Sequence, residues 1–389
     1  MQVLHNPTLP LKPKKIGFLI STDITVGAGI ENVVIDFIEN KINNFEPVLI
    51  QTNYFDHKRL DKYDYIRLKK STEVRELPVA FSKIKRVCKN LGIMSPYVYI
   101  LLLKIYKIVY GEKIKEIFKD IDVVYLGTNA LYSLVPNKIA IIGSQHDGLY
   151  LQSKHRLLNI LKIKFINSKF LYRRIALFHI FPGVFREEVK LEKPFFKLPP
   201  RGVKDSFKSI KTKREGDPRF LFVSRLTECK GVKFILDLWI KSNFNYRLDI
   251  VGEGPLSDHI RNIERNNIVY HGKLKREELE ELYTQADFFL APTQCDIFPM
   301  VVIEAMSKGC YPIISDLIGP VFREFFSEEF ISSVPLQLTS WTVEIKKCIT
   351  NISEIRSKTS EKIVKLVSNE FNAVNISQKF YNEILKQFN

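Results

Sequence analysis

The second half of the chain alternates apolar runs of strand length with segments in which apolar residues recur at helical spacing. The runs are FLFVS (residues 220–224), YRLDIV, NIVYHG, ADFFLAPT and YPIISD. Between two of them, Leu279, Leu282 and Tyr283 mark one face of a helix. Alternation of strands and helices is typical of a parallel, doubly wound sheet.

The first half begins with a similar pattern. KKIGFLIST (residues 14–22) fits a first parallel strand, and a loop of small residues from Gly27 to Gly29 leads into a helical apolar stripe. This loop lacks the dinucleotide spacing Gly-x-Gly-x-x-Gly, because the third residue after Gly29 is Asn32. A later strand, in IAIIGSQHDGLY (residues 139–150), ends in His146 and Asp147.

Two cations follow the strand at residues 220–224. Arg225 leaves its carboxyl end, and Lys230 with Gly231 opens the next helix. Ligands of open α/β sheets bind outside the carboxyl ends of strands, and an Arg fork with a Lys point charge suits a pyrophosphate. The alternative is that both cations are ordinary solvated surface residues. The next strand ends in Gly-Glu-Gly, where Gly254 permits a tight turn and a close backbone approach.

The segment PTQCDIFPMVVIEAMSKG, residues 292–309, carries two carboxylates. Asp296 and Glu304 are separated by a short loop, Ile297 to Pro299, and the apolar start of a helix at Met300. A loop and helix start can offer unpaired backbone N–H groups to an anion. A carboxylate one turn further along accepts hydrogen bonds from sugar hydroxyls, so the pattern indicates a site for a nucleoside diphosphate.

These segments together resemble a known family. SRLTECKG, DIVGEGPL, VYHGKL, ADFFLAPT and Asp-x7-Glu followed by AMSKG occur in the order and approximate spacing of the retaining nucleotide-sugar glycosyltransferases of family four, over about a hundred residues. The resemblance implies a GT-B fold, in which two Rossmann-like α/β domains face a cleft.

The resemblance also implies roles for individual residues. Arg225 and Lys230 would bind the donor diphosphate, and Glu304 would bind the donor ribose. Asp296 and the loop after it, including Phe298, Pro299 and Met300, would face the donor sugar and its phosphates.

Further site residues are implied outside this segment. Gly27 and Gly29 would form a loop over the cleft, Gly254 would lie at the donor, and His146 would contact the donor sugar. The chain departs from the family pattern at two positions. Asp296 replaces the usual Glu, and Ile297, a β-branched residue poorly suited to positive φ, replaces a frequent Gly. These changes would alter the sugar specificity or impair the site.

The length of 389 residues fits two domains. We expect an N-terminal acceptor-binding domain over residues 1–190 and a linker rich in Pro and Lys over 191–216. A nucleotide-sugar-binding domain would follow over 217–370, and the helix at 371–389 would cross back onto the first domain, as the resemblance implies.

The net charge is +16, and the first 200 residues hold most of the excess, with 32 Lys and Arg against 18 Asp and Glu. Two stretches there, Phe81 to Lys119 and Ser153 to Phe178, mix cations with large apolar residues, as interfacial helices do. The most apolar run, Tyr97 to Tyr110, is too short to span a bilayer. The pattern predicts peripheral attachment to an anionic membrane; the alternative is a domain core with a solvated face of lysines.

The N-terminus has no apolar core of the signal-peptide type, which predicts a cytoplasmic protein. The five cysteines show no CxxC spacing, so the sequence predicts neither a disulfide framework nor a zinc site and indicates a reducing compartment. They are Cys88, Cys229, Cys295, Cys310 and Cys348. No Asp-x-Asp pair occurs in the segments that form the predicted donor site, and cations with helix N–H groups can neutralise a diphosphate, so we expect no metal and no cofactor.

The predicted function is a retaining glycosyltransferase that moves a hexose from a UDP- or GDP-linked sugar to a glycan or lipid-linked saccharide. His146, Asp296, Arg225 and Lys230 are the predicted catalytic residues, and the resemblance implies front-face attack without a protein nucleophile. One alternative is a catalytically silent homologue that binds a nucleotide sugar as a partner subunit. A remote alternative is nucleic-acid binding, but no RNP, KH, zinc-finger or helix-turn-helix pattern supports it, so we expect no nucleic-acid partner.

Overall fold

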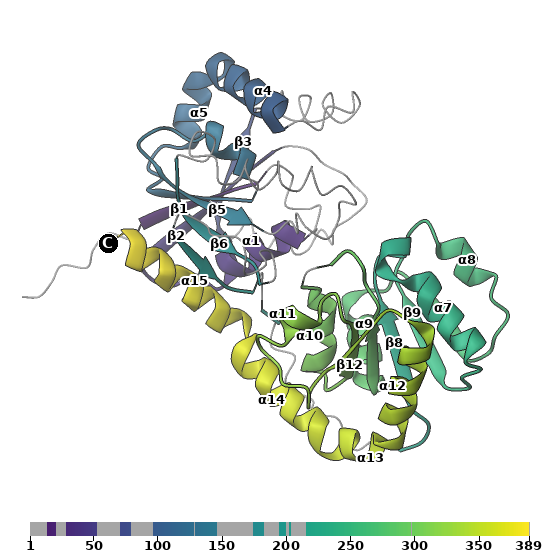
Figure 1. Cartoon of the computed structure of the whole chain (residues 1–389). Helices are drawn as coiled ribbons and strands as arrows, with labels where there is room; N and C mark the ends of the chain where they lie inside the picture. The colour runs from purple at the N-terminus through teal and green to yellow at the C-terminus, as the bar shows by residue number, and fades with distance from the viewer. Residues whose placement is uncertain are drawn as a thin grey trace, which may run out of the picture.

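Two parallel sheets organise the computed structural model of the chain (Figure 1). The structure describes residues 14–20, 29–52, 71–78, 96–127, 129–145, 174–182, 194–199, 202–203, 215–296 and 298–388. The predicted α/β class with two Rossmann-like domains is confirmed, since every strand pairing recorded among these residues within a sheet is parallel and helices follow most strands.

The first sheet has seven strands in the order β3-β2-β1-β4-β5-β6-β7. Their bounds are β1 Lys14–Leu19, β2 Phe45–Thr52, β3 Glu73–Leu77, β4 Val123–Leu126, β5 Ala140–Gln145, β6 Ile175–Ile180 and β7 Phe195–Lys197. The helices described with this sheet are α1 Gly29–Glu39, α4 Pro96–Val109 and α5 Gly111–Ile117. Central strand β4 is buried along its whole length, as strands covered on both faces are.

The second sheet has six strands in the order β10-β9-β8-β11-β12-β13. Their bounds are β8 Arg219–Val223, β9 Arg247–Val251, β10 Ile268–Gly272, β11 Phe288–Ala291, β12 Tyr311–Ser315 and β13 Ser332–Val334. The helices with it are α7 Val232–Lys241, α8 Ser257–Arg261, α9 Arg276–Gln285, α10 Met300–Ser307, α11 Gly319–Phe322, α12 Leu338–Thr350, α13 Ile352–Glu354 and α14 Ser360–Glu370. The strand order reverses between β8 and β11, which makes that edge the topological switch point.

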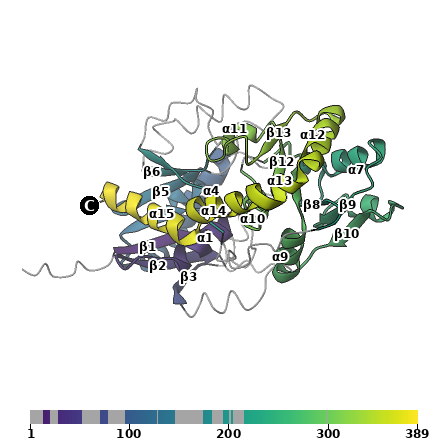
Figure 2. The same ribbon diagram turned by 90° about the horizontal axis from the view of Figure 1, so that it is seen from below.

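The last helix, α15 (Ala373–Phe388), packs on the first sheet rather than the second. Figure 2 shows α14 leading towards α15, which lies over the elements around α1. Phe380 stacks on Phe37 of α1 with ring centroids 3.9 Å apart, and the Tyr381 hydroxyl donates a hydrogen bond to the Phe37 carbonyl at 2.7 Å. The chain therefore crosses between the two sheets a second time, just before α15.

The two crossings lie against each other. The Val203 N–H donates to the Phe371 carbonyl at 2.6 Å, and Val203 forms an isolated parallel bridge with Asn372. A Cβ added to Gly202 would lie 2.3 Å from the Ala373 Cα. Only glycine fits this approach, so the connection between the two halves is a pair of adjoining backbone segments.

Candidate functional site at the switch point

The loops that leave β8 and β11 run alongside each other at the switch point. The Cys229 carbonyl accepts a hydrogen bond from the Gln294 N–H at 2.7 Å. Gly231 has φ of +82°, and a Cβ there would lie 2.4 Å from the Pro292 carbonyl oxygen. The short turn over Glu228–Lys230 and this left-handed glycine bring the start of α7 against the second loop.

The loop after β9 closes on the first of these loops from the other side. Gly252 has φ of +131°, and a Cβ there would lie 1.8 Å from the Ser224 carbonyl oxygen. A Cβ on Gly254 would lie 2.4 Å from the Leu226 carbonyl oxygen. Both glycines thus hold the turn around Arg225 in place, and the close backbone approach expected of them is present. Contact between Gly254 and a donor stays a prediction.

Lys230 and Asp296 form an ion pair across the two loops. Nζ of Lys230 contacts Oδ1 of Asp296, and the Thr293 hydroxyl donates to the other carboxylate oxygen at 2.8 Å. The two side chains remain 24% and 23% exposed, so solvent or a ligand can reach both. The sequence predicts both residues for the site, and the structure places their charged atoms in direct contact.

Arg225 is exposed at the carboxyl end of β8, where the sequence predicts it. Its carbonyl accepts hydrogen bonds from the Thr227 N–H at 2.8 Å and from the Ser224 hydroxyl at 3.1 Å, which fixes the turn. No hydrogen bond or ion pair joins its guanidinium to the described part of the chain. The five donors of this side chain can therefore turn towards an anion at the same edge.

Glu304 lies in α10, one turn beyond Met300, and is half-buried. The hydroxyl of Tyr283, a buried residue of α9, donates to Oε2 of Glu304 at 3.3 Å. Packing of α9 on α10 thus orients the carboxylate. The sequence assigned Tyr283 only to an apolar stripe; its hydroxyl was the signal for a polar contact, because a buried phenol needs a partner.

The loop before α10 differs from the expectation of a row of backbone donors. Pro299 precedes the first residue of the helix and has no N–H, and its carbonyl accepts a bond from the Val302 N–H at 3.1 Å. The Phe298 side chain is only 9% exposed and stacks on Phe322 with centroids 4.9 Å apart. Phe298 therefore serves as a core anchor of the loop. The Met300 N–H remains a candidate donor at the helix start.

Some predicted site residues cannot be placed. His146, Gly27 and Ile297 lie outside the described residues, and Gly29 is described only as the first backbone position of α1. Thr293 and Tyr283, which orient the two carboxylates, were not predicted. Tyr283 acts through a contact between two helices, whereas Thr293 acts within the loop that carries Asp296.

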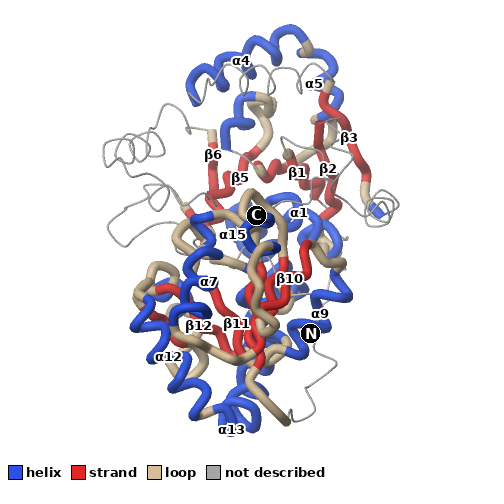
Figure 3. Tube along the Cα trace, turned by 90° about the vertical axis from the view of Figure 1, so that its right-hand side faces the viewer, coloured by secondary structure: helices blue, strands red, loops and turns tan. Residues whose placement is uncertain are grey.

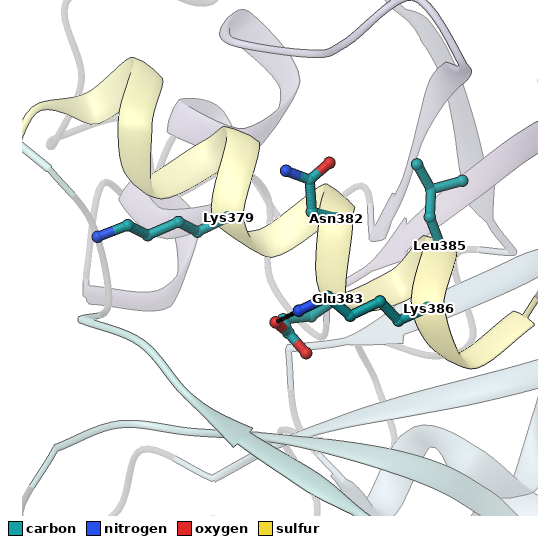
Figure 4. Close-up of a pocket in the computed structure, with 5 residues that line it drawn as sticks. All are labelled: Lys379, Asn382, Glu383, Leu385 and Lys386. Atoms are coloured by element: carbon teal, nitrogen blue, oxygen red, sulfur yellow. Dashed lines mark hydrogen bonds and ion pairs between the residues drawn. The ribbon is translucent and has the colours of Figure 1, made fainter.

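A hollow of about 530 Å³ elsewhere in the molecule does not belong to this site (Figure 4). All five lining residues project from α15, and none of them is a predicted site residue. Within it, the Lys386 ammonium donates to the Glu383 carboxylate at 2.6 Å. In the part of the chain that the structure describes, no three His, Cys, Asp or Glu side chains group as metal ligands do. The expectation that no metal is needed stays a prediction.

Part of the chain is similar to known glycosyltransferases. Residues 203–361 match the family model described as glycosyl transferases group 1. An uncharacterised glycosyltransferase of Methanocaldococcus jannaschii is 28% identical over 113 residues, which are 27% of this chain and 29% of that protein. The O-antigen biosynthesis glycosyltransferase WclY of Escherichia coli is 23% identical over 178 residues, 42% of this chain and 46% of that protein. The resemblance to glycosyltransferases is therefore confirmed.

The solved structures agree on the fold. HepE of Anabaena in complex with UDP-glucose matches with a TM-score of 0.65 and 14% identity, over 96% of this chain and 99% of that one. The whole two-sheet architecture is thus that of GT-B glycosyltransferases. The matched segments span less than half the length of each curated relative named above. Among the helices that the structure describes, none is long and apolar enough to cross a membrane.

Proposed function

We propose that this chain is a retaining glycosyltransferase that moves a hexose from a UDP- or GDP-linked sugar to a glycan or lipid-linked saccharide. One observation carries the proposal: Lys230 and Asp296 form an ion pair at the β8–β11 switch point inside the matched region, with Arg225 at the end of β8 and Glu304 one turn into α10. HepE, which shares the fold, is recorded with UDP-glucose, and this supports a nucleotide sugar as donor.

The ion pair suggests how the donor would be received. A diphosphate carries more negative charge than one carboxylate, so Lys230 would exchange Asp296 for a phosphate oxygen, and Arg225 would add its planar fork. Asp296 would keep its bond from Thr293 and turn its second oxygen to a sugar hydroxyl. Glu304, oriented by Tyr283, would accept from the ribose hydroxyls.

The chemistry follows from this placement. The bond between the anomeric carbon and the diphosphate oxygen breaks, the acceptor hydroxyl oxygen bonds to the same face of that carbon, and the hydroxyl proton passes to the departing diphosphate. Negative charge grows on the departing diphosphate, and two fixed cations stabilise that charge more strongly where water is excluded. We assign no protein nucleophile and no metal to this reaction. His146 would contact the donor sugar, as the resemblance implies.

Helix α4 supports attachment to a membrane surface, on its cytoplasmic face. Leu101, Ile105 and Ile108 lie on one side of the helix and are exposed, Ile108 at 82%, while Leu103 and Tyr106 on the other side are buried. Figure 3 shows α4 and α5 at the end of the first domain that is remote from α12 and α13. An apolar stripe of this kind suits the interface of a bilayer.

The charges beside this stripe favour anionic lipid. Exposed Lys104 lies on α4, and exposed Lys113 and Lys115 lie on α5, with Lys115 paired to Glu112 at 2.7 Å. Lys107 instead donates to the Val135 carbonyl at 2.9 Å, and burial lowers the pKa of its ammonium group. A lipid-linked saccharide would reach the cleft from the same surface.

A thermal-shift screen tests the donor proposal. The chain is heated with UDP, GDP, ADP and their common sugar conjugates, with and without magnesium, because a ligand that binds the native state raises the melting temperature. We expect a shift with one nucleotide family that does not depend on the metal. No shift with any of them would overturn the proposal.

The catalytically silent alternative rests on Asp296 in place of the family's usual glutamate and on Ile297 in place of a frequent glycine. Turnover separates it from the enzyme. A chain that binds a nucleotide sugar but releases no free nucleotide, with acceptor or with water, would be the silent homologue.

A further inference from the structure

Two cysteines lie in the adjoining loops at the switch point. Cys229 lies in the turn after β8 and is exposed, and Cys295 lies in the loop after β11 and is half-buried. They are sixty-six positions apart in the sequence, as Lys230 and Asp296 are. Neither side chain takes part in the proposed donor site.

Contacts on both sides of the cysteines hold the loops in register. The Cys229 carbonyl bonds to the N–H of Gln294, the residue before Cys295. Lys230, the residue after Cys229, contacts Asp296, the residue after Cys295. The cysteine pair is therefore bracketed by one backbone bond and one ion pair, which leaves little freedom for the two thiols to separate.

The two thiols influence each other. Burial raises the pKa of the Cys295 thiol to about 12, and the neighbouring Cys229 thiol acts in the same direction, while the charge of Lys230 acts in the opposite direction. The other described cysteines are placed differently: Cys310 is buried and donates to the Tyr283 carbonyl at 3.1 Å, and Cys348 is buried on the inner face of α12. Among the described cysteines, Cys229 and Cys295 thus differ from the others because they lie in adjoining loops and are accessible to solvent.

We propose that Cys229 and Cys295 form a reversible disulfide that fixes the two loops together and turns off donor binding. The switch rests on the proposed function, because it acts on Lys230 and Asp296. Cys229 and Cys295 directly precede Lys230 and Asp296 in the sequence. A disulfide between them would keep the ion pair together, so Lys230 could not exchange Asp296 for a diphosphate. Disulfide geometry requires the two backbones to be close, as the bond from Gln294 to Cys229 already makes them.

The oxidant is a small-molecule disulfide. The exposed Cys229 thiolate attacks one of its sulfurs and releases one small thiol, which leaves a mixed disulfide on Cys229. Cys295 then loses its proton to water and attacks the Cys229 sulfur, which expels the second small thiol. Two protein thiols are oxidised and one disulfide is reduced to two thiols. Since the raised pKa of Cys295 limits the second step, bridge formation accelerates as pH rises.

The test separates the bridge from its effect. The full chain is incubated with oxidised glutathione, free thiols are alkylated, and peptide mass spectrometry searches for a Cys229–Cys295 linked pair. We expect the linked pair in the wild type and in Cys348→Ser, and its absence in Cys229→Ser and Cys295→Ser. Absence from the oxidised wild type overturns the proposal, whatever the protein binds.

Binding is measured on the same samples with the nucleotide that the reduced chain prefers. The dissociation constant should rise by about tenfold or more on oxidation, return with dithiothreitol, and stay constant in both single serine variants. A linked pair with unchanged binding overturns the switch. If the reduced chain binds no nucleotide, the donor function fails and the switch with it, while the mass measurement still decides on the bridge.

Discussion

The ion pair between Lys230 and Asp296 makes opposite predictions for its two partners. If Lys230 exchanges Asp296 for the diphosphate, then Asp296 competes with the donor for the ammonium group. Lys230→Ala should weaken nucleotide binding, whereas Asp296→Asn should strengthen it and lower turnover. A purely structural ion pair would make both variants weaker binders, because each would loosen the same loops.

The magnitudes follow from exposure and charge. Both side chains are about a quarter exposed, so breaking their contact costs about 1 kcal/mol. A charge-assisted bond from Lys230 to a phosphate contributes about 3 kcal/mol, so the net loss in Lys230→Ala is about 2 kcal/mol. That corresponds to roughly a thirtyfold rise in the dissociation constant. Asp296→Asn removes the competitor and keeps an acceptor for Thr293, for a gain of about 1 kcal/mol, or roughly fivefold.

Titration calorimetry with the preferred nucleoside diphosphate measures both variants. Lys233→Ala is the matched control, because it removes the same charge from the first turn of α7, where Lys233 forms an exposed pair with Glu228 at 3.0 Å. The control should bind within about twofold of the wild type, since exposed pairs contribute little. Equal losses in Lys230→Ala and Lys233→Ala, or weaker binding by Asp296→Asn, would refute the exchange.

Three further predictions concern the ribose, the membrane and the loop turn. Glu304→Ala should weaken nucleotide binding by about 1–3 kcal/mol, because it removes hydrogen bonds to a charged acceptor, and unchanged affinity in calorimetry would place the ribose elsewhere. Ile108→Ser should reduce co-sedimentation with anionic liposomes by roughly tenfold or more, given about 2 kcal/mol for burying an isoleucine; Val343→Ser on α12, where the residue is 66% exposed, should change nothing. Liposome binding that changes neither in Ile108→Ser nor with salt concentration would contradict the proposal that α4 contacts the membrane. Gly252→Ala should destabilise the fold by about 2–4 kcal/mol, since its Cβ meets the Ser224 carbonyl at positive φ, and an unchanged urea midpoint would contradict that packing.

The sequence predicted the positions of strands better than the contacts between side chains that are distant in the sequence. The strand expected at residues 220–224 is β8, Arg219–Val223, and the run YPIISD at residues 311–316 contains β12, Tyr311–Ser315. Both are apolar runs bounded by polar residues, a local signal. The meeting of Lys230 with Asp296 joins residues far apart in the sequence, and it depends on β8 and β11 becoming neighbours, which no local pattern specifies.

The sequence also could not separate packing from exposure within one helix. The apolar run from Tyr97 to Tyr110 contains Tyr106, which is buried and donates to the Pro78 carbonyl at 3.0 Å, and Ile108, which is exposed. Both alternatives left open for this run, core and interface, are therefore present on opposite faces of α4. Only the position of the helix on the sheet decides which residue belongs to which face.

Phe298 and Asp296 show how one short loop serves two purposes. Phe298 lies in an aromatic cluster with Phe322 and Phe371, and Phe371 also accepts the hydrogen bond from Val203 at the crossing between the two halves. The loop is thereby fixed to the junction through a buried ring, which keeps Met300 and the start of α10 in place. Two residues earlier, Asp296 remains accessible and held by Thr293. A rigid anchor beside a reachable carboxylate is what a site needs when it must exchange one ionic partner for another without reorganising its backbone.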